Sequence, residues 1–326
     1  MSQWNGIDLP PRFRVISDND YAGDPDGLVQ LAHHLLSPSV EIRGIISSHL
    51  RAGDDWDLTG DAVAAGVDAV VELTKVMNLN QLPPLVEGSK VPLTSINQPQ
   101  FSAGAQLIVD EANRTDVDTP LYIVCGGSLT SIASAWLMDP SITSKLTVIW
   151  IGGPEYPGHR HLPPKAMPIE YNLLEDLIAG QVVFNNSDLD LWQIPRGTYR
   201  DCNASTSELI VRMRDKSALG AYLYEQLSIA ARRNIINSGY FSEMYSLGDS
   251  PLVLLTALQT GFEPAPASSQ WVDHERPQID DQGQYCFTQK EQKVRVFTVL
   301  DVRMMFEDMY AKFELTSKSA TPSNNR

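Results

Sequence analysis

Four aspartates crowd one short stretch near the start of the chain, and their spacing could support chemistry. The stretch FRVISDNDYAGDPD spans residues 13–26 and contains Asp18, Asp20, Asp24 and Asp26. Like charges this close together repel one another unless a cation or a polyhydroxyl ligand compensates them. Because the four acidic groups offer only oxygen as ligand atoms, they favour a hard ion such as Ca²⁺ or Mg²⁺.

Two other interpretations of the stretch are a solvated acidic turn and an EF-hand. Aspartate, asparagine, glycine and proline all form turns, so a solvated acidic turn is the simpler one. An EF-hand is excluded, because Val29 stands at position 12 counted from Asp18, where a bidentate glutamate is required.

The elements around the aspartates form a predicted βαβ unit. Residues Phe13 to Ile16 are apolar and predict a strand, Gly27 to Leu36 has helical periodicity, and Val40 to Ser47 predicts a second strand. Such a unit implies parallel strands joined by a right-handed crossover. The carboxylates therefore lie at the carboxyl end of a strand, where open parallel sheets place their ligands.

Later segments repeat this alternation of strands and helices. They predict an α/β fold, doubly wound, with a largely parallel central sheet and helices on both faces. We expect one domain over residues 1–326, with a core at about 12–314 and a disordered tail at 316–326. The predicted segments are the strands Pro120–Val124, Leu146–Ile151, Leu189–Ile194 and Val294–Val302, and the helices Ser246–Gln259 and Met304–Phe313.

Composition excludes several classes of partner. The chain has 326 residues, 43% of them hydrophobic, and a net charge of −15. This charge argues against a nucleic-acid backbone or an anionic membrane as partner. Its three cysteines are too few for a disulfide framework, and no apolar run is long enough to span a bilayer. With no signal peptide in view, we expect a cytoplasmic protein.

Five motifs occur in an order that resembles the nucleoside hydrolases. Asp18, Asp20 and Asp24 match the Asp-x-Asp-x-x-x-Asp-Asp signature of that family, although Pro25 displaces the fourth carboxylate to Asp26. The resemblance extends over residues 12–313 and implies the fold of that family and hydrolysis of ribonucleosides. The other motifs are Gly127-Ser128-Leu129-Thr130, Ile151-Gly152-Gly153, Glu170-Tyr171-Asn172 and Leu247-Gly248-Asp249-Ser250-Pro251.

The resemblance implies a Ca²⁺ ion at the floor of the pocket. Asp20 matches the residue that binds the metal and takes the proton of the attacking water. Asp249 matches a second carboxylate ligand, and Asp26 is the candidate for the remaining one. Gly126 matches the residue that offers a main-chain carbonyl, with a one-residue shift to Cys125 left open.

Other matched positions are implied to bind the sugar. Asp24 matches the residue that holds the ribose 2′-hydroxyl, and Glu170 and Asn172 match ligands of further hydroxyls. Asp18 is interpreted as a brace of the loop. The resemblance also implies a role in purine metabolism and nucleoside salvage, and we expect a homodimer or homotetramer.

The position before Asp249 departs from the resemblance. Many relatives have a histidine there as general acid, whereas this chain has Gly248. We therefore predict that purine bases stack on an aromatic side chain, with Trp271 as first candidate and Trp56 as second. His49, which follows a strand, is a further candidate for contact with the substrate.

Two alternative functions remain open at this point. The chain could hydrolyse a different N- or O-glycoside on the same scaffold, or it could be a non-catalytic binder of nucleosides or sugars. Keeping Asp20, Asp24 and Asp249 favours an enzyme, because binding alone needs no activated water.

Overall fold

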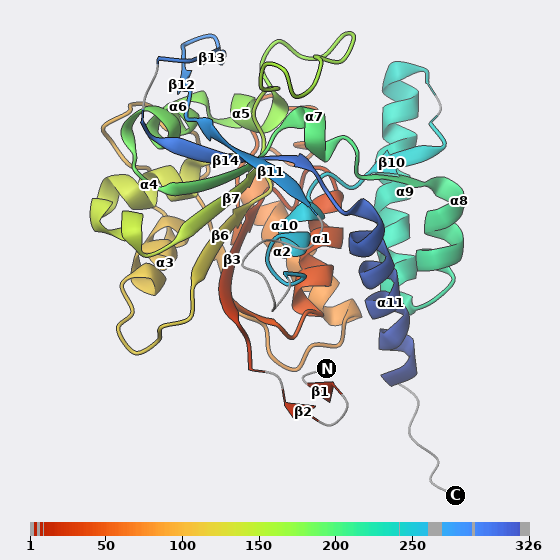
Figure 1. The fold of residues 1–326 in the computed structure, drawn as a ribbon. Coiled ribbons are helices and arrows are strands. Elements are labelled where there is room, and N and C mark those ends of the chain that lie inside the picture. Colours follow the sequence, from red (N-terminus) through yellow and green to blue (C-terminus); the bar gives the residue numbers. More distant parts are fainter. Residues whose placement is uncertain are drawn as a thin grey trace, which may run out of the picture.

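The computed structural model describes residues 3–4, 7–8, 10–240, 242–259, 269–288 and 291–319. An eight-stranded sheet crosses the centre of the molecule (Figure 1). Its strands are β3 (Phe13–Asn19), β4 (Val40–Ser47), β5 (Leu85–Glu87), β6 (Leu121–Cys125), β7 (Thr147–Ile151), β8 (Asp190–Ile194), β11 (Gln270–Glu275) and β14 (Lys293–Val299).

The order of the strands is β11-β14-β8-β7-β6-β3-β4-β5. All neighbouring pairs are parallel except β11 with β14, which are antiparallel. The chain winds outward from β3 in both directions, so the doubly wound, largely parallel sheet predicted from the sequence is confirmed.

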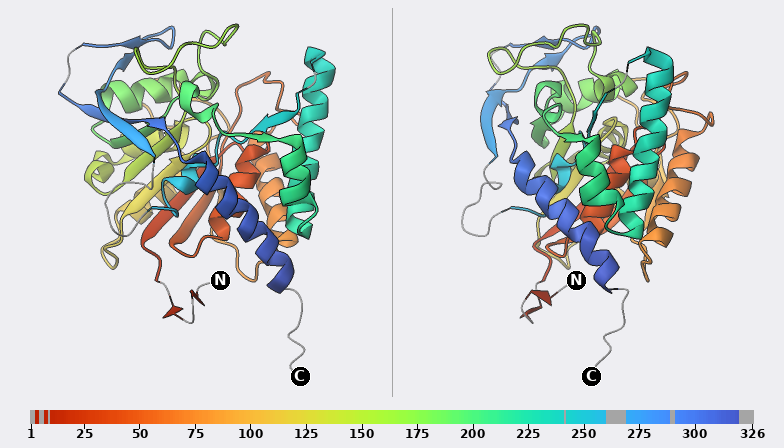
Figure 2. Two further views of the ribbon diagram at one scale, coloured as in Figure 1. Left: turned by 45° about the vertical axis from the view of Figure 1, so that its right-hand side comes forward. Right: turned by 90° about the vertical axis from the view of Figure 1, so that its right-hand side faces the viewer.

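Helices cover both faces of this sheet, as the two turned views show (Figure 2). One face packs against α1 (Asp26–Leu35), α2 (Ala62–Val76), α9 (Ala218–Ser238), α10 (Pro251–Leu254) and α11 (Val302–Ser319). The other face packs against α3 (Ala103–Ala112), α4 (Thr130–Met138) and α6 (Leu177–Gln181).

Shorter elements connect these layers. They are the helices α5 (Tyr171–Glu175), α7 (Arg196–Tyr199), α8 (Thr206–Leu209), η1 (Pro140–Ser144), η2 (Val182–Asn186) and η3 (Ile210–Arg214), and the strands β1 (Gln3–Trp4), β2 (Ile7–Asp8), β9 (Asn203–Ser205), β10 (Met244–Ser246), β12 (Gln278–Ile279) and β13 (Tyr285–Cys286).

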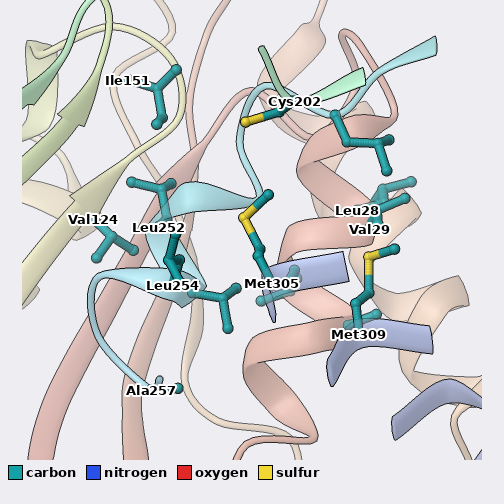
Figure 3. Packing of buried hydrophobic residues seen from close by; sticks show 14 of the residues in the cluster. Leu28, Val29, Val124, Ile151, Cys202, Leu252, Leu254, Ala257, Met305 and Met309 are labelled. Carbon is teal, nitrogen blue, oxygen red and sulfur yellow. The ribbon is translucent and has the colours of Figure 1, made fainter. Parts of the chain in front are cut away.

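Successive residues of the strands supply the two halves of the core. Val15 packs into the cluster on the α1 side, and the next residue, Ile16, packs into the cluster on the α3 side. This alternation follows from the pleat of a strand that is buried on both faces. Figure 3 shows the first cluster, in which Leu28 and Val29 of α1 and Met305 of α11 take part.

Three predicted boundaries are wrong. Strand β3 continues to Asn19, because β4 and β6 pair with it along its length, so Asp18 lies in the strand. The helix expected over residues 246–259 is only the short α10, since Ser246 pairs with Asn203 in a two-stranded sheet. The last helix runs to Ser319, so the tail expected from residue 316 is helical for its first turn. Residues 320–326 lie outside the described residues.

Among the described helices, none is both long and apolar enough to cross a membrane.

Candidate active site

A cavity of about 240 Å³ opens where the carboxyl ends of the central strands meet. Asp20, directly after β3, lies in its wall, together with Gly126, directly after β6, and Ile151, the last residue of β7. These three strands are neighbours in the sheet. The cavity therefore occupies the edge at which parallel α/β sheets bind ligands.

Four carboxylates from two distant parts of the chain line this cavity. Asp20, Asp24 and Asp26 come from the loop after β3 and the start of α1, and Asp249 comes from the turn before α10. Asp26 is the first residue of α1, where the helix dipole favours a negative charge. The backbone N–H of Asp249 donates to Oδ2 of Asp26 at 3.1 Å, which joins the two parts directly.

Asn19 holds the cluster together, and sequence reasoning missed it. Its Oδ1 accepts a hydrogen bond from the backbone N–H of Asp20 at 2.9 Å, and its Nδ2 donates to Oδ2 of Asp249 at 2.8 Å. The amide packs against Gly126 so closely that a Cβ there would lie 2.2 Å from Nδ2. The glycine after β6 therefore leaves room for Asn19, and this close approach is the signal that could have revealed it.

Burial acts on all four carboxyl groups, and repulsion by neighbouring carboxylates acts on Asp20, Asp26 and Asp249. Burial is the main cause in each case; it raises the pKa of Asp249 to about 7 and that of Asp24 to about 6. Burial, followed by the charge of Asp249, raises the pKa of Asp20 and of Asp26 well above the ordinary value. The cluster thus favours protons or a cation at neutral pH.

The chemistry of these donors fits a hard cation. Within the described residues, no three His, Cys, Asp or Glu side chains already stand in the arrangement of a metal site. The donors of the cluster are nevertheless all oxygen atoms, as Ca²⁺ prefers, and Asp20, Asp26 and Asp249 repel one another in a buried place. A divalent cation would remove this repulsion, so these three residues could hold one.

Asn172 lies in the wall opposite the first loop. Its Nδ2 donates to the carbonyl of Gly126 at 2.9 Å and to that of Ile151 at 2.7 Å, which ties the ends of β6 and β7 together. One lone pair of the Gly126 carbonyl is therefore occupied. The side-chain oxygen of Asn172 takes no part in these two hydrogen bonds, and Asn172 lines the cavity.

Glu170 is not in the described wall of the cavity, so its predicted direct contact with the sugar is not supported. The carboxylate is fully buried, with Oε2 accepting from the backbone N–H groups of Gly153 and Leu173 and Oε1 from the hydroxyl of Tyr199. Glu170 is thus the N-cap of α5. Tyr199, which the sequence did not suggest, lines the cavity in its place.

Trp56 lines the rim of the cavity and is held by a buried network. The side chain of Asp54 accepts a hydrogen bond from the backbone N–H of Trp56 at 2.8 Å and from the hydroxyl of Tyr171 at 2.9 Å. Arg51 forms salt bridges with both Asp54 and Glu175. Because Tyr171 and Glu175 belong to α5, the loop that carries Trp56 is anchored to the cavity wall.

Arg233 of α9 stacks on the indole of Trp56. Its guanidinium carbon lies 4.1 Å from the ring centroid. Two further cavities, of about 250 and 280 Å³, adjoin Trp56, and Arg233 lines both of them. The described wall of the first cavity contains Trp56 but not Arg233. The charge of Arg233 still acts on the cavity, because it opposes the rise in the pKa of Asp24 that burial causes.

Trp271 and His49 lie away from the cavity, and both predicted contacts are corrected. Trp271 is on β11, at the far edge of the sheet, and packs under the guanidinium of Arg295 at 4.1 Å. His49 is buried, and its Nε2 is 3.0 Å from the hydroxyl of Thr130, behind the cavity wall. Asp18 is bonded to the hydroxyl of Ser48, as a brace would be.

Comparison with solved structures identifies the architecture. A plant nucleoside hydrolase superimposes with a TM-score of 0.70 at 15% identity, covering 93% of this chain and 99% of that one. The purine-preferring ribonucleoside hydrolase from Gardnerella vaginalis gives a TM-score of 0.70 at 17% identity, covering 94% and 100%. The inosine-uridine preferring nucleoside hydrolase from Bacillus anthracis gives 0.63 at 15% identity, covering 92% and 99%.

Sequence comparisons add nothing to this. No family model matches the chain, and no curated protein matches it in sequence. The structure nevertheless superimposes on those of the two nucleoside hydrolases with the TM-score of 0.70 over almost the full length of both superimposed chains. The chain has the fold of the nucleoside hydrolases, as its ordered motifs predicted.

Proposed function

We propose that the protein hydrolyses the N-glycosidic bond of ribonucleosides and releases the free base and ribose. The observation that carries the proposal is the convergence of Asp20, Asp24, Asp26 and Asp249 on one cavity at the strand ends of a nucleoside hydrolase fold. A wall of carboxylates suits a reaction in which the sugar becomes positively charged.

The chemical step needs no covalent nucleophile. The C1′–N bond breaks and its electron pair leaves with the base, while the oxygen of a water molecule bonds to C1′. Asp20 takes the proton of that water as general base. Asp24 and Asn172 bind hydroxyl groups of the sugar, and Tyr199 connects the sugar site to Glu170.

The proposed cofactor is Ca²⁺. Asp20, Asp26 and Asp249 are its proposed carboxylate ligands, and the free lone pair of the Gly126 carbonyl is the fourth donor. A bound Ca²⁺ would lower the pKa of a water molecule and offset the charge of the carboxylates.

Trp56 takes the place of Trp271 as the proposed platform for the base. It is a tryptophan in the wall of the cavity, and aromatic stacking contributes about 0.5–1.5 kcal/mol. A purine offers two fused rings to this surface and a pyrimidine only one. We therefore propose that purine nucleosides are better substrates than uridine and cytidine.

Release of base from a panel of ribonucleosides, with and without a chelator, tests the proposal. We expect inosine, adenosine or guanosine to be hydrolysed, and the activity to be lost with chelator and restored by added Ca²⁺. Binding of nucleosides without release of base would instead support a non-catalytic binder. Hydrolysis of other glycosides alone would support the second alternative.

A cytoplasmic location, a homodimer or homotetramer, and a role in nucleoside salvage stay predictions. Size-exclusion chromatography with light scattering measures the oligomeric state directly.

A further inference from the structure

The position before Asp249 supplies no proton donor to activate the departing base. Gly248 lines the cavity next to Asp249 and has no side chain to donate a proton. Resting on the proposed function, we infer that Arg233 is a positioning residue for the leaving group: through the indole of Trp56, it stabilises the negative charge that the base acquires as the glycosidic bond breaks.

Trp56 takes part both in the wall of the active cavity and in the contact with Arg233. Trp56 lines the active cavity and both neighbouring cavities. Arg233 lines the two neighbouring cavities, but it is not in the described wall of the active cavity. The guanidinium carbon lies 4.1 Å from the ring centroid, which is the distance of a close cation–π contact. A base stacked on the cavity side of Trp56 would therefore have a positive charge behind its platform.

The charge of Arg233 is not neutralised by a carboxylate partner. Within the described part of the chain, Arg233 forms no salt bridge, whereas the adjacent Arg232 lies 3.9 Å from Glu225. An arginine stays ionised at every working pH. Arg233 is only partly exposed, so its charge is less screened by water than that of a fully exposed arginine.

The platform itself is rigid enough to transmit this effect. Asp54 accepts from the backbone of Trp56 and from Tyr171, and Arg51 joins Asp54 to Glu175. Arg233 of α9 thus contacts the indole of Trp56, whereas the network that includes Tyr171 and Glu175 of α5 supports its backbone. Loss of Arg233 would remove the positive charge while the backbone of Trp56 kept its own support.

The chemistry balances without a further reactant. When the C1′–N bond breaks, the electron pair passes to the ring nitrogen and spreads over the base. The indole lies against that ring, and the cation on its other face makes the indole less repulsive toward negative charge. The water molecule that attacks C1′ gives its proton to Asp20, and the base takes a proton from solvent water. Asp20 then returns its proton to the hydroxide left in the solvent, which restores the carboxylate.

Arg233→Gln, assayed on two substrates, tests the inference. Inosine has a poor leaving group, whereas 4-nitrophenyl riboside releases a stable anion that needs no help. We expect kcat for inosine to fall about tenfold, the scale of a partly buried cation–π contact, and kcat for the nitrophenyl compound to stay within about twofold. Arg233→Lys should restore most of the activity on inosine, because it keeps the charge.

Arg232→Gln is the matched control, since it removes a neighbouring, largely exposed arginine from the same helix. It should leave both substrates unchanged. Two results for an Arg233→Gln protein with an unchanged melting temperature would overturn the inference: equal losses of activity on the two substrates, or no loss on inosine. Release of base by the wild type would still support the proposed function in that case. If the wild type released no base from any nucleoside, both would fall.

Discussion

Removal of one carboxylate from the cavity gives a quantitative test of the charge cluster. Asp249→Asn keeps the shape of the side chain, and the new amide oxygen can still accept the hydrogen bond from Asn19. What changes is the charge. In the wild type, burial is the main cause that raises the pKa of Asp249 to about 7, from an ordinary value of 3.8.

The sign of the effect follows from this pKa. A carboxyl group with a raised pKa in the folded state stabilises the protein fully at low pH and loses that contribution as the pH rises through about 7. Between pH 5 and pH 7 the carboxyl group of Asp249 has lost its proton in the unfolded chain and has kept it in the folded chain. At about 1.4 kcal/mol for each of the two pH units, this carboxyl group lowers the free energy of unfolding of the wild type by about 3 kcal/mol.

The assay is urea denaturation of chelated wild type and chelated Asp249→Asn at pH 5 and at pH 8. Differences between the two proteins are compared, because other groups also titrate in this range. His34, for example, has its pKa lowered to about 3 by burial, so its contribution to stability falls as the pH falls below about 6.5. Contributions of groups such as His34 cancel in the difference, whereas those of Asp20 and Asp26 change with the charge of Asp249 and belong to the effect that is measured.

We expect the unfolding free energy of chelated Asp249→Asn, relative to wild type, to rise by about 3 kcal/mol from pH 5 to pH 8. A hundredfold excess of Ca²⁺ over Kd at pH 8 should cancel most of this difference, since about 2.7 kcal/mol of stabilisation would reach the wild type alone. Parallel pH profiles for the two chelated proteins would refute the idea of a repelling cluster. Equal stabilisation of both proteins by Ca²⁺ would remove Asp249 from the proposed ligands.

Three further predictions concern the proposed reaction. Asp20→Asn should lower kcat by at least ~100-fold while keeping most of the nucleoside affinity measured by calorimetry, and Asp68→Asn on the exposed face of α2 should do neither. Trp56→Ala should lower kcat for inosine more than for 4-nitrophenyl riboside, whereas Trp271→Ala should affect the two substrates equally. Gly126→Ala should lower the melting temperature and the activity together, because the new Cβ would lie 2.2 Å from the amide of Asn19; an unchanged melting temperature would contradict this.

The parts of the site that sequence predicted are those set by local patterns. Apolar strands that end in glycine or aspartate are visible in the chain, and the parallel sheet then brings their carboxyl ends to one edge. The resemblance to the nucleoside hydrolases assigned Asp20, Gly126 and Asp249 to one site, and all three line the cavity. The displaced Asp26 also reaches it, because Pro25 is the N-cap of α1 and Asp26 becomes its first residue.

The errors have a common cause in contacts that no local pattern encodes. Trp271 resembled a rim residue, but β11 pairs with β14 and carries it to the far edge of the sheet. Glu170 resembled a sugar ligand, but its oxygen atoms are occupied by backbone amides and by Tyr199. Trp56 and Arg233 lie far apart in sequence, and only the packing of α9 against the first loops brings them together.

Gly248 connects these findings. A Cβ at this position would lie 3.4 Å from Oδ2 of Asp26 and 3.4 Å from the ring of Tyr199, which is ordinary contact, and its φ is not positive. Neither space nor backbone therefore demands a glycine here. The absent side chain keeps the wall next to Asp249 open and leaves no acid on that side. The inferred charge stabilisation of the base therefore rests on Trp56, which lines the same cavity and contacts Arg233, an arginine that makes no salt bridge among the described residues.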